Sequence, residues 1–262
     1  VKKPKFGHGS GLNPCIDCKI YMLKRTKLLM EQFNASFVVT GEVLGQRPMS
    51  QHKQALNLIE KESGMSGKIL RALSAKYLPK TDMEKECIID ISKLPEINGR
   101  GRHKQLELAK IYGIKSYSTP AGGCLLTDKN FSIKLKDLID NKKDFSLSDV
   151  PLLKIGRHFR FGGSKIVSAR NEDEVKKILS LKNRDDLVFE IKNGKGTTTI
   201  LQGEINASSI LLSKKITAYY SKSTSDLYEI SMRDDKTLSY VSIDKPKEDE
   251  ISQYNLAYKK LR

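Results

Sequence analysis

The sequence predicts an α/β protein with two domains of different architecture. In the first half, short apolar segments of strand length alternate with helical patterns, which favours a parallel α/β sheet. In the second half, short strand patterns dominate and are separated by turn signals, which favours a smaller, mostly antiparallel α+β domain. The polar stretch Asn141–Asp149 lies between the two patterns. We therefore expect one domain at residues 1–145 and a second at residues 146–262.

Hydrophobic periodicity defines the elements of the first domain. In chain order they are a Gly-rich loop at 1–15, a helix at 17–32, a buried strand at 37–41, a helix at 50–62 that ends before Gly64, a strand at 68–73, and a helix at 102–112 that ends before Gly113. Strands and helices in this order are typical of a parallel sheet covered by helices.

The second domain is predicted from period-2 patterns and turn residues. Its expected elements are strands at 159–161 and 165–169, a helix that begins after Asn171, and strands at 187–191, 197–201, 215–220, 227–232 and 238–243. Asn171 with Glu174 three residues later resembles a capping box. Asn193-Gly194 between two strand patterns indicates a hairpin turn.

The formal net charge of +16 at pH 7 is the clearest functional signal in the composition. Basic residues are in excess in both halves, so the charge does not belong to a tail. A folded protein that is basic throughout most often binds a polyanion such as nucleic acid. The alternative is a protein from an organism with a Lys-rich proteome that has no such partner.

Composition also excludes several classes of protein. No apolar run approaches the roughly 18 residues of a membrane-spanning helix, so we expect neither an integral membrane protein nor a membrane partner. Four cysteines in 262 residues do not suggest a secreted disulfide scaffold, so the predicted compartment is the reducing cytoplasm. The chain begins at Val1 without a signal-peptide pattern, which we interpret as a fragment of a longer protein.

Cys15 and Cys18 form a CxxC pair at the start of the first predicted helix. A helix N-terminus favours the thiolate, and the spacing lets both sulfurs face one metal or each other. No second CxxC or HxxxH follows at zinc-ribbon spacing, so a closed four-ligand zinc site is not expected. Two incidental thiols are the alternative.

Cys124 follows a Pro-Ala-Gly-Gly run, where the backbone can approach a ligand closely. Together with Cys15 and Cys18 it admits two chemistries. Cys124 can carry a persulfide that Cys18 later attacks, leaving a disulfide between them. Alternatively, all three thiolates can hold a [4Fe–4S] cluster with one open iron. The apolar neighbours of Cys87 favour a packing role for that residue.

The segment 41–51 (GEVLGQRPMSQ) follows a predicted strand and precedes a helix. In a parallel α/β sheet this is the edge where ligands bind. Gly41, Gly45 and Arg47 are therefore candidates for holding a phosphate at the N-terminus of the next helix. The segment lacks the Gly-Lys-Ser/Thr of a Walker A loop, and a plain strand–helix connection is an equal alternative.

Two further segments are candidate contacts with nucleic-acid phosphates. Arg100, Arg102 and Lys104 lie on a Gly-broken loop, for which a solvated turn is the alternative. In the second, Arg157, His158 and Arg160 alternate with phenylalanines, as on RNA-binding surfaces. A half-buried strand with one charged face produces the same pattern.

The first ~145 residues resemble the PP-loop tRNA thiouridylases, a family that includes tRNA-specific 2-thiouridylase and 4-thiouridine synthetase. The resemblance is carried by four segments in order: 9–19 (GSGLNPCIDCK), 40–51 (TGEVLGQRPMSQ), 99–102 (GRGR) and 119–127 (TPAGGCLLT). It implies the C-terminal part of a Rossmann-like PP-loop ATPase domain. It also implies that Cys18 and Cys124 are the catalytic cysteines, with Cys15 as the third ligand in relatives that use a cluster.

Residues from about 154 to 181 are similar to the RNA-binding domain of NFACT-family proteins. The similarity is carried by Arg157–Arg160 and Ala169–Glu174. It implies that the second domain binds RNA.

These resemblances imply an ATP-dependent tRNA sulfurtransferase that adenylylates a uridine and replaces its oxygen with sulfur. Its expected cofactors are ATP with Mg²⁺ and, on the cluster route, a [4Fe–4S] cluster. The expected partners are tRNA and a sulfur donor protein or sulfide. The family's ATP-binding Ser-Gly-Gly-x-Asp-Ser loop does not occur in this sequence, so this chain alone is expected to be inactive. The alternative is a non-catalytic RNA-binding protein with structural thiols.

Overall fold

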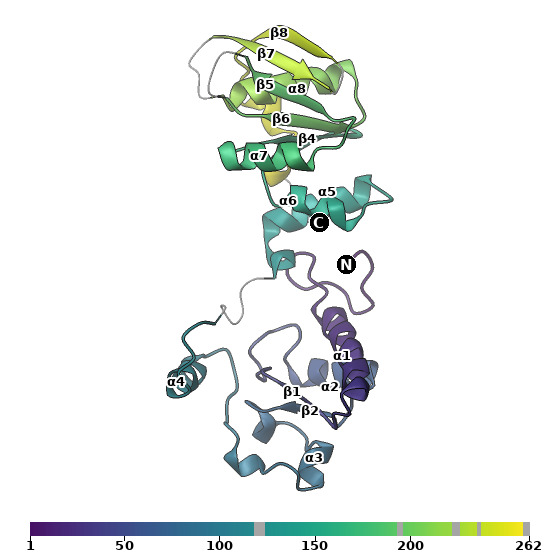
Figure 1. The fold of residues 1–262 in the computed structure, drawn as a ribbon, viewed down its shortest axis with the longest axis vertical. Coiled ribbons are helices and arrows are strands. Elements are labelled where there is room, and N and C mark those ends of the chain that lie inside the picture. The colour runs from purple at the N-terminus through teal and green to yellow at the C-terminus, as the bar shows by residue number, and fades with distance from the viewer. Residues whose placement is uncertain (118–123, 193–195, 222–225, 235–236, 259–262) are drawn as a thin grey trace. The chain divides into compact units, whose positions relative to one another are not determined.

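The structure is a computed structural model that describes residues 1–117, 124–192, 196–221, 226–234 and 237–258. The chain forms two compact units, Val1–Thr127 (unit 1) and Asp128–Arg262 (unit 2) (Figure 1). This boundary precedes the one expected at residue 145. The reason is that helix α5 (Lys129–Asn141) packs against α6 (Val150–Leu153) and therefore belongs to unit 2.

Unit 1 contains the elements that the sequence pattern predicts, with ends displaced by one to three residues. They are α1 (Cys15–Gln32), β1 (Val38–Thr40), α2 (Lys53–Ser63), β2 (Ile69–Arg71) and α4 (His103–Ile111); a short helix α3 (Asp82–Lys85) was not predicted. Gly64 ends α2 in the left-handed conformation, with φ 68°, which glycine adopts without steric cost.

A core between α1, α2 and β2 holds unit 1 together. Ile20 and Leu23 of α1 are spaced to lie on one helix face and are buried with Ile59 of α2 and Ile69 of β2. In contrast, α4 has no buried residue. The core therefore fixes the helix that carries the CxxC pair against the β1–β2 pair.

Strands β1 and β2 pair in parallel, with Val38 opposite Ile69 and Thr40 opposite Arg71. They form the one sheet found in the described residues of unit 1. The mixed α/β character predicted for this unit is thus observed as a parallel pair with helices. A Rossmann-like domain is not shown.

Unit 2 is built on a six-stranded antiparallel sheet in the order β3-β4-β6-β5-β7-β8 (Figure 1). Its further elements are β3 (Arg157–Phe161), β4 (Ser164–Ser168), α7 (Glu172–Leu181), β5 (Leu187–Ile191), β6 (Thr199–Gly203), α8 (Ala207–Tyr219), β7 (Leu227–Arg233), β8 (Leu238–Asp244) and α9 (Asp249–Ser252). The mostly antiparallel α+β prediction is confirmed for this unit.

Both faces of the central strands are buried. Successive side chains of a strand point to opposite faces. Ile166 accordingly packs in a core with Ile216 of α8, whereas Val167 packs in a second core with Ile178 of α7. Apolar residues at consecutive positions thus let the sheet carry a helix on each side.

The strand predicted at 215–220 is wrong, because these residues form the end of α8. Asn206 caps this helix by accepting a hydrogen bond from the Ser209 N–H at 2.9 Å. Leu212 and Ile216, four residues apart, are both buried against the sheet.

The predicted hairpin turn at 193–194 lies outside the described residues. Within the described parts of the chain, no helix has the length and apolar character to cross a membrane.

Candidate functional site

In unit 1, the loop that carries Cys124 lies against the loop that precedes α1. The Leu12 N–H donates a hydrogen bond to the Leu126 carbonyl at 3.0 Å. The Thr127 hydroxyl donates to the Cys124 carbonyl at 2.7 Å, which fixes the backbone next to the thiol. These contacts bring Cys124 near the CxxC pair at the start of α1.

The charges of Cys18 and Cys124 both act on the Cys15 thiol. Burial is the main cause that raises the pKa of the half-buried Cys15 thiol, and Cys124 and Cys18 add to it. Arg47 and Lys19 act in the opposite direction without overcoming the burial. The expectation that the helix N-terminus favours the thiolate is therefore reversed for Cys15. Cys18 and Cys124 are exposed.

The [4Fe–4S] cluster that the family resemblance implies would need Cys15, Cys18 and Cys124 around one metal site. Among the described residues, no three Cys, His, Asp or Glu side chains are placed so that they hold one metal ion. Cys87, predicted to pack in a core, is exposed and has a positive φ of 57° after α3.

A cavity of about 450 Å³ lies at the end of β1, beside α1. Gly41 and Arg47 line it, as predicted for a phosphate site, together with Lys19 and Gln51. The side-chain oxygen of Gln51 is buried and has no hydrogen-bond partner in the described structure. Gly45 does not line the cavity. The cavity combines Arg47 and Lys19 with the buried carboxylate of Glu42, which pairs with Lys19 at 3.2 Å, and with the unsatisfied amide of Gln51.

The loop 41–51 packs on the basic loop 98–104. Leu44 and Asn98 form a β-bridge, and the Gly99 N–H donates to the Leu44 carbonyl at 2.7 Å. A side chain at Gly45 would contact the Gly99 backbone at 3.3 Å, which explains the glycine there. The two predicted phosphate segments are thus one surface of unit 1.

The cations of the basic loop differ in their exposure and in their contacts. Arg100 is exposed and Arg102 is half-buried before α4. The Lys104 ammonium donates to the Glu96 carbonyl at 3.0 Å, so it stabilises the loop itself.

In unit 2, Arg157 is half-buried at the start of β3. It donates to the Ala169 carbonyl at 3.1 Å and lies over the Tyr220 ring at 4.2 Å from the centroid. This cation–π contact holds the guanidinium close to the aromatic ring. Lys154 precedes Arg157 by three residues, and Arg170 directly follows Ala169, the partner of Arg157. Both side chains are exposed. We call Lys154, Arg157 and Arg170 the Arg157 surface.

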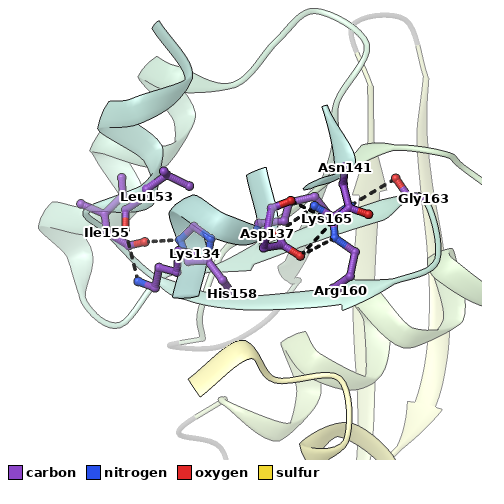
Figure 2. A network of polar contacts seen from close by, with 9 residues as sticks. All are labelled: Lys134, Asp137, Asn141, Leu153, Ile155, His158, Arg160, Gly163 and Lys165. Atoms are coloured by element: carbon purple, nitrogen blue, oxygen red, sulfur yellow. Dashed lines mark hydrogen bonds and ion pairs between the residues drawn. The ribbon is translucent and has the colours of Figure 1, made fainter. Parts of the chain in front are cut away.

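His158, predicted as an RNA contact, is an interior residue with 1% of its surface exposed. Its Nε2 lies 2.7 Å from the Ile155 carbonyl oxygen (Figure 2). Burial, with the charges of Lys165 and Lys134, lowers the pKa of the His158 ring well below its ordinary value. The structure therefore leaves His158 no surface for contact with RNA.

Arg160, the third predicted contact, forms a two-bond ion pair with Asp137 of α5 (Figure 2). The same carboxylate accepts from the Lys165 ammonium at 2.6 Å. The guanidinium is thus held in place by a buried acid. Asp137 lies on α5, a helix that the sequence pattern did not predict. Asp128 as N-cap, with Phe131 and Leu135 four residues apart, was the available signal.

Comparison with known proteins bears on unit 2. Residues 156–255 match the family model described as NFACT protein RNA binding domain, which spans β3 to the segment after α9. No curated protein matches the chain. Among solved structures, the C-terminal part of the fibronectin/fibrinogen-binding protein from Streptococcus suis is similar with 13% identity and a TM-score of 0.34. That alignment covers 92% of this chain and 94% of the other.

Proposed function

We propose that the protein binds RNA through unit 2, with tRNA as the partner. The observation that carries the proposal is the match of residues 156–255 to an RNA-binding domain. The net charge of +16 supports it, because contacts with phosphates supply most of the non-specific affinity for nucleic acid.

The Arg157 surface is the proposed contact with the RNA backbone. Arg170 and Lys154 are exposed, and Arg157 is held against Tyr220 at 4.2 Å. A cation fixed in this way loses little side-chain entropy on binding. An aromatic ring beside it offers a surface on which a base can stack.

The experiment is fluorescence anisotropy of the full chain with labelled tRNA at several salt concentrations. The variant Lys154→Glu/Arg170→Glu changes the charge of unit 2. The matched control, Lys24→Glu/Arg25→Glu, makes the same change on the exposed side of α1. We expect the unit 2 variant to lose about tenfold or more in affinity relative to the control and to have a shallower salt dependence. Equal losses would contradict the proposal.

A second function, sulfur transfer to tRNA by unit 1, is favoured by one observation: Cys18, Cys124, Arg47 and Lys19 all act electrostatically on the Cys15 thiol. In this proposal Cys124 carries a persulfide. The Cys18 thiolate attacks the inner sulfur, a Cys18–Cys124 disulfide forms, and the outer sulfur leaves as hydrosulfide. Hydrosulfide then displaces AMP from an adenylylated uridine, and a thiol reductant restores both cysteines.

The activation step of this second function needs ATP with Mg²⁺. The cavity beside Gly41 and Arg47 is the proposed phosphate site within this chain. The test is the thionucleoside content of tRNA in a deletion strain complemented with the full-length protein or its Cys124→Ser variant. Loss of thiolation with the variant supports sulfur transfer. Unchanged thiolation in the deletion strain contradicts it and leaves RNA binding as the function.

A further inference from the structure

Unit 2 contains a cavity of about 540 Å³, and the match to the RNA-binding family model assigns it no role. This volume is within the range of small-molecule sites, roughly 300–1,000 Å³. Leu138 of α5, Leu152 of α6 and Leu181 of α7 form its apolar wall. Three leucines from three helices produce a surface against which a flat, apolar ring can pack.

The cavity also contains the cations Lys142, Arg160 and Lys165. Asp137 lies behind two of them and accepts from Arg160 at 2.8 Å and from Lys165 at 2.6 Å (Figure 2). Lys142 pairs with Asp149, which also lines the cavity. One carboxylate thus serves both Arg160 and Lys165, so positive charge is in excess at this end.

A further cation, Lys134 of α5, acts electrostatically on Lys165 but does not line the cavity. The Lys134 ammonium donates to the carbonyls of Leu153 and Gly156, at 3.3 and 3.2 Å, and lies on the same helix as Asp137. Burial lowers the pKa of Lys134 and of Lys165 to about 8. A buried cation without its own counter-ion is costly, so an anion at this end of the cavity is stabilising.

The remaining polar group of interest is the amide of Gln202 on β6. Its nitrogen donates to the Asp186 carboxylate at 2.5 Å, which orients the side chain. An amide side chain that lines the cavity can form a hydrogen bond with the edge of a nucleobase.

We propose that this cavity binds one unstacked nucleotide of a single-stranded RNA segment, with the base against the leucine wall and a phosphate at Arg160 and Lys165. The proposal rests on the RNA binding proposed for unit 2. It adds a site for a single base to a surface that contacts the backbone. Sequence-specific recognition of RNA commonly uses bases that are splayed out in this way.

The test uses the full chain, a labelled single-stranded RNA oligonucleotide, and two pairs of matched variants. Ser180→Phe places a ring at the cavity, where Ser180 is exposed, and Ser208→Phe makes the same change on the exposed side of α8. Lys142→Glu reverses a charge at the cavity, and Lys143→Glu reverses the neighbouring charge outside the cavity lining.

We expect Ser180→Phe and Lys142→Glu each to weaken RNA binding about tenfold relative to its control, the loss of one stacked base or more. Far-ultraviolet circular dichroism of each variant establishes that it is folded. If wild type binds RNA and both cavity variants match their controls, the cavity proposal is overturned while RNA binding stands. If wild type binds no RNA, both proposals fail. Binding of free AMP or UMP that RNA does not displace would make this a site for a free nucleotide, which also overturns the proposal.

Discussion

Arg160 and Asp137 form a bidentate ion pair across 23 residues of sequence, with Nε to Oδ1 at 2.9 Å and Nη2 to Oδ2 at 2.8 Å. The pair connects β3 to α5, and both side chains are largely buried. Burial alone would raise the pKa of Asp137, but the hydrogen bonds and charges of Arg160 and Lys165 lower it. The carboxylate therefore stays ionised, and α5 is held to the sheet.

Removal of this charge is expected to destabilise unit 2. Asp137→Asn leaves Arg160 and Lys165 without their counter-ion, and we expect a loss of about 3–5 kcal/mol in the free energy of unfolding. Asp140→Asn, which breaks the exposed pair with Lys136 on the same helix, is the control and should cost under about 1 kcal/mol. Urea denaturation measures both. Similar losses for the two variants would contradict the role given to Asp137.

The two buried lysines predict how stability depends on pH. The pKa of Lys134 and that of Lys165 are lowered from 10.5 to about 8, first by burial. Between pH 8 and 10.5 the unfolded chain therefore binds more protons than the folded one, so the free energy of unfolding rises with pH. The groups facing Lys165 are Asp137, Arg160 and Lys134.

Urea denaturation of wild type and Lys165→Met at several pH values isolates the contribution of one lysine. The variant lacks one of the two titrating groups, so its free energy of unfolding should rise less steeply between pH 8 and 10.5. Parallel curves for the two proteins would show that Lys165 keeps its ordinary pKa in the folded chain.

The sheet of unit 2 and the helices of unit 1 are predictable because their apolar residues follow a clear period. Thus Ile20 and Leu23 give the buried face of α1, and Phe159 and Ile166 belong to strands that the pattern locates. The strand prediction at the end of α8 is wrong because Ile216 and Thr217 are β-branched and favour strands locally, whereas Asn206 caps a helix that extends through them.

The buried imidazole of His158 gives a spectroscopic prediction. Because burial and two nearby ammonium groups lower its pKa well below the ordinary value, the ring should be neutral near pH 6.5, where an exposed histidine is about half protonated. Its Nε2 should carry the proton that is donated to the Ile155 carbonyl. Two-dimensional NMR of the imidazole nitrogens, assigned with the His158→Gln variant, measures this. A titration with a midpoint near 6.5 would contradict the buried position.

The neighbourhood of Cys15 predicts an order of thiol reactivity. Cys15 is half-buried with a raised pKa, so alkylation by iodoacetamide should be slower there than at the exposed Cys18 and Cys124. Cys124→Ser removes a group that raises the pKa of Cys15 and should speed alkylation of Cys15, whereas Arg47→Ala removes a cation that lowers this pKa and should slow it.

Mass spectrometry of tryptic peptides follows each rate. Cys87→Ser serves as the control, because Cys87 is exposed but is not among the groups that shift the pKa of Cys15. If the alkylation rate at Cys15 is unchanged by Cys124→Ser, the Cys124 loop does not lie close to the CxxC pair, which would contradict this account.

The candidate sites were less predictable than the fold. The basic character of Arg157 and Arg160 is visible in the sequence, but which of them is held by an acid depends on α5, 23 residues away. The cavity beside Lys142 needs residues from α5, α6, α7 and β6, which no local pattern connects. The proximity of Cys15 and Cys124 was suggested by the family resemblance, not by their spacing.

The central claim is that RNA contacts unit 2, and ultraviolet crosslinking of the full chain to tRNA tests it most directly. Digestion and mass spectrometry locate the crosslinked peptides along the sequence. We predict crosslinks within residues 128–258, concentrated near Lys154, Arg157 and Arg170. Crosslinks confined to residues 1–127, or none at a tRNA concentration that saturates binding, would contradict the account.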